Sequence, residues 1–214
     1  CMATIPEDMF IEAVNALVKA EEDWVPSEPE TSLYIRPFAF ACESSLGVHK
    51  SKAYKFVIIL SPVGAYYAEG LAPVKIMVED EYVRAVQGGT GFTKCGGNYA
   101  GSIIGQVKAE KYGCSQVLWL DGRERKYVEE VGAMNIMFKI DGEIYTAPIE
   151  GTVLPGVTRD SIIHILKDWG YKVNETHLSV DDLMQAGRDG RLEEVYGTGT
   201  AAVISPVGAL VYKG

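Results

Sequence analysis

The chain has no block of lysine and arginine residues. Its 20 basic residues are outnumbered by 29 acidic ones, so the formal net charge is -9 at pH 7 and the isoelectric point lies near 4.9. Proteins bind nucleic acids chiefly through cations that face the phosphates. The composition therefore excludes a broad nucleic-acid surface, and it leaves open the binding of a single phosphate by backbone N–H groups.

A long apolar run is also missing. No stretch reaches the roughly 20 residues that a transmembrane helix needs. The first residues lack the basic, apolar and small-residue order of a signal peptide. We therefore expect a cytoplasmic protein with no membrane partner.

Closely spaced cysteines are absent too. The four cysteines, Cys1, Cys42, Cys95 and Cys114, form no C-x-x-C pair and no metal-like spacing with the three histidines. We expect reduced thiols and no metal site.

What is present is the composition of a globular protein. The 214 residues, 47% hydrophobic and 23% charged, suit one large domain or one and a half ordinary ones. Periodicity predicts mostly strands with interspersed helices, and the Asp141-Gly142 pair predicts a tight hairpin. The expected strands are 32–40, 54–60, 74–79, 84–86, 116–120, 127–130, 135–140, 143–147, 171–177 and 209–212. The expected helices are 6–23, one that follows the turn 93–99 and ends near 113, one opened by 154–158 and closed by 170, and one beginning at 179.

A single lysine stands out for its position. Lys94 lies in a glycine-rich turn before the second expected helix, with no acidic residue within five positions on either side. A lysine sheltered from water on such a turn is a candidate nucleophilic amine, although most lysines are solvated surface charges. The neighbouring Gly88, Gly89 and Gly91 do not make a P-loop, because Lys94 is preceded by threonine and followed by cysteine.

Other parts of the chain could serve this lysine. Glu129 and Glu130 end an apolar strand, so the period-2 rule predicts that one of them faces inward and needs a partner. The turns 156–158 and 197–201 are places where several backbone N–H groups could converge on an anion, although such turns are more often simple connections. A lysine for an aldehyde, a carboxylate for a ring nitrogen, Tyr99 and two amide turns match the needs of pyridoxal 5'-phosphate.

The chain resembles the branched-chain amino acid aminotransferases, which are pyridoxal-phosphate enzymes of fold type IV. The resemblance rests on motifs along nearly the whole sequence: 32–37, 45–48, 61–66, 94–99, 116–120, 130–135, 154–158 and 197–201. It implies an α+β fold, with a small α/β domain followed by a larger, β-rich pseudo-barrel domain that carries helices. By this resemblance residues 1–66 are the later half of the small domain and residues 67–214 most of the large, cofactor-binding one.

The resemblance also implies roles for individual residues around the cofactor. Lys94 would be the catalytic residue that holds pyridoxal phosphate covalently and moves the substrate proton, and Glu130 would pair with the ring nitrogen. Tyr99 would hydrogen-bond the ring oxygen and Leu154 would pack on the ring face. The remaining cofactor contacts would be phosphate-binding ones, from the amides of Val157 and Thr158 together with Thr200.

The substrate pocket follows in the same way. Tyr34, Arg36 and Tyr66 would line it, the Thr200 and Ala201 amides would receive the substrate carboxylate, and Leu46 and Val48 would reach in from the neighbouring subunit of a homodimer. From spacing alone, the face shared by Tyr34 and Arg36 is equally an ordinary aromatic sheet edge with a surface arginine. The implied substrates are L-leucine, L-isoleucine or L-valine with 2-oxoglutarate, giving branched 2-oxo acids and L-glutamate.

The sequence also departs from the family. Relatives begin roughly a hundred residues earlier and extend further at the other end, so we expect a fragment that lacks the N-terminal part of the small domain and the extreme C-terminus. Ala133 stands where many relatives have threonine. Two alternatives remain open: another fold-type IV enzyme, such as a D-amino-acid aminotransferase or a lyase, and a catalytically silent fragment that binds the cofactor.

Overall fold

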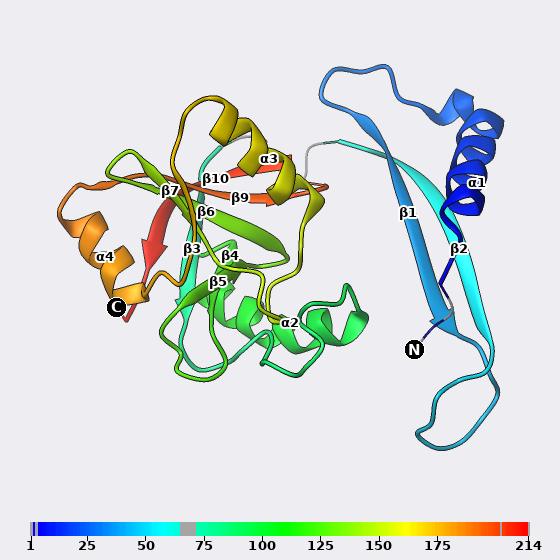
Figure 1. Cartoon of the computed structure of the whole chain (residues 1–214), viewed down its shortest axis with the longest axis horizontal. Helices are drawn as coiled ribbons and strands as arrows, with labels where there is room; N and C mark the ends of the chain where they lie inside the picture. The colour runs from blue at the N-terminus through cyan, green and yellow to red at the C-terminus, as the bar shows by residue number, and fades with distance from the viewer. Residues whose placement is uncertain (1, 3, 65–71, 202, 214) are drawn as a thin grey trace. The chain divides into compact units, whose positions relative to one another are not determined.

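The structure is a computed structural model that describes residues 2, 4–64, 72–201 and 203–213. The chain divides into two compact units, Cys1–Ala68 and Glu69–Gly214 (Figure 1). Each unit is described by itself below.

The described residues of the first unit form one α-helix, a short 3-10 helix and a two-stranded sheet. The amphipathic pattern near the N-terminus forms α1 (Glu7–Ala20), followed by the short 3-10 helix η1 (Glu22–Trp24). Strands β1 (Ser32–Ala41) and β2 (Tyr54–Val63) pair antiparallel along their whole length. The rings of Phe10 and Phe56 lie 6.0 Å apart, which shows that α1 packs against β2.

Strand β2 is longer than the sequence predicts. The expected strand ends at residue 60, and Ser61–Val63 instead continue the ladder, with Leu33 opposite Pro62. Proline lacks the N–H that a central strand must donate. In a two-stranded sheet each strand has one unpaired edge, so a proline is tolerated wherever its nitrogen faces outward.

In the described part of the second unit, one mixed sheet carries three helices. Its strands are β3 (Val74–Glu79), β4 (Gln116–Leu120), β5 (Val128–Val131), β6 (Met134–Ile140), β7 (Glu143–Thr146), β8 (Val173–Glu175), β9 (Leu192–Gly199) and β10 (Val203–Val211). The strand order is β5-β4-β3-β10-β9-β6-β7-β8, and β5 also pairs with β6. This extra pairing closes six strands into a ring, which confirms the predicted pseudo-barrel.

Two hairpins follow directly from local sequence. Asp141 and Gly142 both have positive φ, 51° and 77°, as the predicted tight turn between β6 and β7 requires. Gly132 has φ 53° and begins the two-residue connection between β5 and β6, so that Glu130 lies opposite Asn135. This second turn places two polar side chains side by side in the interior.

Two predicted strands differ in the structure. Residues 84–86 belong to no strand, and the chain bends at Arg84, whose side chain donates to the carbonyl oxygens of Gly91 and Thr152. The strand expected at 171–177 is shorter in the structure, where only β8 (Val173–Glu175) forms, and two of its three residues are half-buried. It pairs with β7 alone and lies at the end of the sheet.

Three helices pack on this sheet. Helix α2 (Gly96–Lys111) contacts β3 and β4, α3 (Val157–Asp168) contacts β8 and β9, and α4 (Val180–Arg188) contacts β9 (Figure 1). Among the described residues no helix is long and apolar enough to cross a membrane. The same residues contain no cluster of histidine, cysteine and carboxylate side chains suited to a metal ion.

Candidate active site

The turn that carries Lys94 is fixed by a buried asparagine. The Asn98 amide donates to the carbonyl oxygens of Thr90 and Thr93, each at 2.8 Å, and its Oδ1 accepts from the Thr90 hydroxyl at 2.7 Å. Asn98 lies in the first turn of α2, so the loop before the helix is tied to the helix itself. Lys94 therefore stands at a defined position on the rim of the second unit.

Lys94 reaches back to the helix that follows it. Its Nζ donates to the Tyr99 hydroxyl at 3.1 Å and lies 5.6 Å from the centre of the Tyr99 ring. The expectation that Lys94 is sheltered from water is wrong for the described chain, in which its side chain is exposed. The reason is its place on a loop, where among the described residues Tyr99 is its hydrogen-bond partner.

Glu130 lies deep in the same region. The turn at Gly132 puts it opposite Asn135, whose amide donates to Glu130 Oε1 at 3.2 Å and to the Leu154 carbonyl at 2.9 Å. The Leu154 N–H donates to the same Oε1 at 2.8 Å. The 130–135 motif thus folds on itself and fixes both the glutamate and the backbone of Leu154.

The partner of the other Glu130 oxygen is Arg84. Arg84 Nε lies 2.9 Å from Glu130 Oε2, with the two side chains 8% and 3% exposed. Arg84 Nε forms no hydrogen bond with any of the described residues, so its contact with Glu130 is an ion pair without a hydrogen bond. Arg84 Nη2 donates to the carbonyl oxygens of Gly91 and Thr152. Burial raises the pKa of Glu130 to about 7, against the opposing effects of the Arg84 charge and the Leu154 N–H.

Glu130 is thus the inward glutamate with partners that the alternation predicts, and Glu129, which points to the other face of the strand, is buried as well. All four residues of β5 are buried, and because successive residues point to opposite faces, both faces of this strand are covered. The Thr152 hydroxyl donates to Glu129 Oε1, while Oε2 has no hydrogen-bond partner among the described residues. Burial raises the pKa of Glu129, and the Thr152 hydrogen bond and the Arg84 charge oppose that rise.

These groups surround one small pocket. Lys94, Tyr99, Glu130 and Leu154 all line it, so the structure brings together four of the predicted site residues. The other lining residues are Arg84, Thr93, Asn98, Ser102, Gly132 and Ala133. An amine, a phenol and a buried carboxyl therefore face a common space.

The predicted phosphate contacts lie nearby in the fold but do not line this pocket. Helix α3 begins at Val157 without a side-chain cap, so its first N–H groups are open to an anion. A Cβ on Gly156 would lie 2.1 Å from Asn135 Oδ1, so the helix start approaches Asn135 as closely as only glycine allows. Val157 is exposed and Thr158 half-buried.

The predicted carboxylate contacts lie at the turn between β9 and β10. Thr200 and Ala201 are exposed there. Thr198, two residues earlier, lies opposite Asn135 in the sheet, and its buried hydroxyl has no hydrogen-bond partner among the described residues. Asn135 thus connects the pocket to both amide turns.

The predicted substrate residues belong to the first unit. Tyr34 and Arg36 share one face of β1, and the Arg36 guanidinium carbon lies 4.9 Å from the centre of the Tyr34 ring. Leu46 and Val48 lie in the loop between β1 and β2 and are fully exposed. Tyr66 lies outside the described residues.

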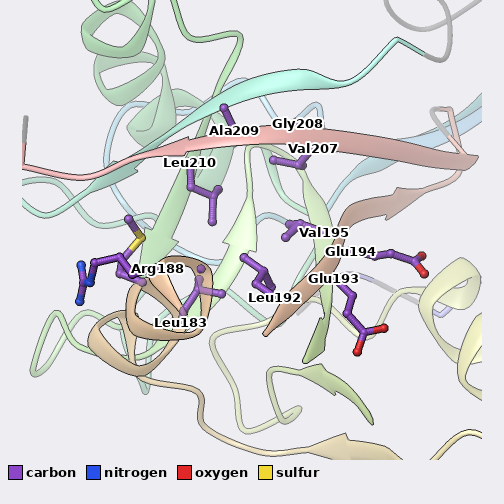
Figure 2. Close-up of a pocket in the computed structure, with 12 residues that line it drawn as sticks. Leu183, Arg188, Leu192, Glu193, Glu194, Val195, Val207, Gly208, Ala209 and Leu210 are labelled. Carbon is purple, nitrogen blue, oxygen red and sulfur yellow. The ribbon is translucent and has the colours of Figure 1, made fainter. Parts of the chain in front are cut away.

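A larger groove of about 400 Å³ lies between α4, β9 and β10 (Figure 2). Its ionisable lining residues are Arg188, Glu193 and Glu194, and the rest of the lining is mainly aliphatic. It contains none of the predicted site residues and no lysine. The chemistry predicted for Lys94 therefore belongs to the smaller pocket.

The residues around Lys94 fit pyridoxal phosphate. An amine suits its aldehyde, a phenol its ring oxygen and a buried carboxyl its ring nitrogen, while the uncapped start of α3 suits its phosphate. Sequence reasoning missed Arg84 and Thr152, whose partners lie 46 and 23 positions away in the chain. It included Asn135 in a motif without giving it a role.

Comparisons with known proteins agree with this chemistry. The family model described as amino-transferase class IV matches residues 2–210. Branched-chain-amino-acid aminotransferase 2 of Bacillus subtilis is 56% identical over 213 residues, covering 100% of this chain and 59% of that protein. A probable branched-chain-amino-acid aminotransferase of Staphylococcus aureus is 54% identical and is covered to 60%.

Solved structures give the same result. The crystal structure of the Escherichia coli branched-chain amino acid aminotransferase has a TM-score of 0.80 at 29% identity, covering 98% of this chain and 65% of that one. The Thermoproteus uzoniensis branched-chain aminotransferase with norvaline has a TM-score of 0.76 at 27% identity, with 94% and 63% covered. Another branched-chain amino acid aminotransferase, solved with pyridoxamine 5'-phosphate, has a TM-score of 0.79 at 30% identity, with 96% and 64% covered.

These matches also give the extent of the chain relative to the family. The chain spans about 60% of the length of the curated relatives it matches. Since the family model covers nearly the whole sequence, the chain belongs to the class IV aminotransferases.

Proposed function

We propose that the protein is a branched-chain amino acid aminotransferase that uses pyridoxal phosphate. The observation that carries the proposal is the pocket in which the Lys94 amine, the Tyr99 hydroxyl and the buried Glu130 carboxyl meet. Relatives with this name match the chain along its whole length at 54–56% identity. The reaction transfers the amino group of L-leucine, L-isoleucine or L-valine to 2-oxoglutarate. Because the chain spans only part of its relatives, this activity is proposed for the whole protein.

Each residue of the pocket has a distinct task in this proposal. Bound pyridoxal phosphate supplies an electron-accepting ring that makes the α proton of an amino acid acidic. Lys94 holds the cofactor and moves that proton with its Nζ, and Glu130 holds the proton of the ring nitrogen. Tyr99 donates a hydrogen bond to the ring oxygen, and Leu154 supports the ring face.

The remaining contacts are proposed on the same basis. The amides of Val157 and Thr158, with Thr200, hold the phosphate, and the amides of Thr200 and Ala201 receive the substrate carboxylate. Tyr34, Arg36 and Tyr66 line the substrate pocket, and Leu46 and Val48 enter it from the partner in a cytoplasmic homodimer. The full exposure of Leu46 and Val48 supports a role outside their own subunit. In this assignment residues 1–66 belong to the small domain and residues 67–214 to the large one.

Borohydride reduction tests the assignment of Lys94. We expect reduction in the presence of pyridoxal phosphate to fix the cofactor on the peptide that contains Lys94, as mass spectrometry would show. Lys94→Ala should lose the label, while Lys111→Ala, at the exposed end of α2, should keep it. Labelling at another lysine would refute the assignment.

Substrate addition separates the competing functions. An absorbance change on adding L-leucine, and none with D-alanine, is expected for a branched-chain aminotransferase. The reverse preference would indicate a D-amino-acid enzyme of the same fold type. A cofactor band that responds to neither amino acid would indicate a silent cofactor-binding fragment.

A further inference from the structure

Arg84 lies inside the second unit next to two buried carboxyl groups. Its Nε is 2.9 Å from Glu130 Oε2, and its side chain is 8% exposed. Its Nη2 is held by the carbonyl oxygens of Gly91 and Thr152. Thr152 also donates its hydroxyl to Glu129, so one residue contacts both the arginine and the second glutamate.

The charges in this cluster do not cancel. One guanidinium faces two carboxyl groups, and burial raises the pKa of both glutamates. The Arg84 charge opposes that rise at each, while Glu129 adds to it at Glu130. Among the described residues, the other ionisable groups that face Glu130 are Lys94, whose charge favours the carboxylate, and Tyr99 across the pocket. A buried carboxyl that loses its cation takes up a proton.

The hydrogen bonds of Arg84 fix which oxygen of the Glu130 carboxyl group its charge faces. Two carbonyl groups from different loops hold the outer nitrogen, so the inner nitrogen stays beside Oε2. The two N–H donors on Oε1 fix the opposite side of the carboxylate. Lysine has one nitrogen at the end of its chain and cannot occupy both positions at once.

We propose that Arg84 is a positioning residue that favours the ionised form of Glu130 and orients its carboxylate for the ring nitrogen of the cofactor, whereas the neighbouring Glu129 carboxylate disfavours that form. The orientation toward the cofactor rests on the proposed function. The effect on the Glu130 proton does not, because it is a property of the protein without cofactor.

The first experiment titrates Glu130 in the cofactor-free protein by carbon NMR of its carboxyl group, assigned with Glu130→Gln. Arg84→Met should raise the proton affinity of Glu130 at least about tenfold, because the nearest cation is removed. Glu129→Gln should lower it, because a like charge is removed. Arg191→Met is the matched control, since Arg191 pairs with Asp141 and Asp189 at the surface and should leave the titration unchanged.

Arg84→Met alone leaves two buried carboxyl groups without their cation, which disfavours folding. The double variant Arg84→Met with Glu129→Gln removes one charge of each sign and serves as a second test if the single variant does not fold. Glu130 should bind its proton more tightly in the double variant than in Glu129→Gln alone. Equal titrations in folded protein, shown by circular dichroism, would overturn the proposal.

The second experiment measures the affinity for pyridoxal phosphate between pH 6 and 9 by absorbance. In Arg84→Met we expect about a tenfold loss or more near neutral pH that recovers as the pH rises, because the carboxylate then forms without its cation. A loss of equal size at every pH would show that Arg84 is merely structural. Absence of borohydride labelling at Lys94 in the unmodified protein, with the Glu130 titration shifted as expected, would instead refute the proposed function alone.

Discussion

Glu130 links the stability of the protein to pH. Its pKa in the folded chain is about 7, whereas an ordinary glutamate titrates near 4.5. The folded state therefore holds this proton more tightly than the unfolded state. As the pH rises from about 4.5 to 7, the unfolded chain ionises first, so stability is lost across that window.

We expect this loss to amount to about 3 kcal/mol in the cofactor-free protein, from a shift of 7 - 4.5 at about 1.4 kcal/mol per pKa unit. Urea unfolding at pH 5 and pH 7.5 should show the unmodified protein losing stability relative to Glu130→Gln. Glu110→Gln, at an exposed position of α2, should not change the pH dependence. Parallel pH curves for the protein and Glu130→Gln would contradict the prediction.

Among the site residues, local spacing alone predicts only contacts between residues close along the chain, whereas Glu130 and Leu154 were assigned to the site of Lys94 through the family resemblance. Lys94 and Tyr99 meet because five positions bring a loop residue onto the first helical turn. No local sequence pattern identifies Arg84 as a site residue, because its partner Glu130 lies 46 positions away and the two meet only when the sheet closes. The exposure of Lys94 and the burial of both glutamates likewise depend on tertiary packing rather than on local pattern.

Helix α2, which carries Tyr99, packs against the sheet through a glycine. A Cβ on Gly105 would lie 2.5 Å from the Trp119 ring, and Trp119 is fully buried on β4. The Trp119 indole donates to the Gly132 carbonyl at 3.0 Å, in the turn that places Glu130. The spacing between α2 and β4 is therefore coupled to the geometry of the pocket.

Gly105→Ala should destabilise the protein by about 1–3 kcal/mol, because the added methyl group overpacks a rigid ring. Gly101→Ala is a matched control in the same helix, since a Cβ there meets nothing within 4 Å. It should stabilise the helix by about 0.5–1 kcal/mol, because glycine is a poor helix former. Urea unfolding of both variants measures the difference, and equal effects would show that α2 moves freely on β4.

The elements that the sequence predicted best are those with strong local signals. The Asp141-Gly142 hairpin and the helix that begins after Ser179 are confirmed, the latter with the Ser179 hydroxyl accepting the Asp182 N–H at 3.0 Å. The strand predicted at 84–86 is wrong, and the Arg84 side chain there donates to the Thr152 carbonyl, a contact across 68 positions that no local pattern records. Closure of the sheet through β5 and β6 depends on pairings that no single segment encodes.

At the scale of the whole molecule, the two units differ in how much they bury. None of the described residues of Cys1–Ala68 is buried, whereas the other unit encloses side chains as large as Trp119 and Phe138. A two-stranded sheet is marginal in water without a covered face. The first unit therefore lacks a core of its own within the described residues.

Hydrogen exchange of the intact chain should show this contrast. We expect the hydrogen-exchange protection of the β1 and β2 amides to be at least about a hundredfold lower than that of the β4 and β6 amides, because local opening of the first unit exposes little buried surface. Mass spectrometry of peptides from each strand provides the measurement. Equal protection in the two units would mean that the first unit is stabilised by contacts beyond those described.

The position of β10 has a consequence for synthesis on the ribosome. β10 (Val203–Val211) is the last strand of the described residues, yet it lies between β3 and β9 in the sheet. While the ribosome still holds residues 203–211, β3 and β9 each present an unpaired edge, and the ring of six strands stays open. Completion of the fold must therefore wait for release of this segment, so the nascent chain has a period of exposed strand edges in which chaperone binding competes with aggregation.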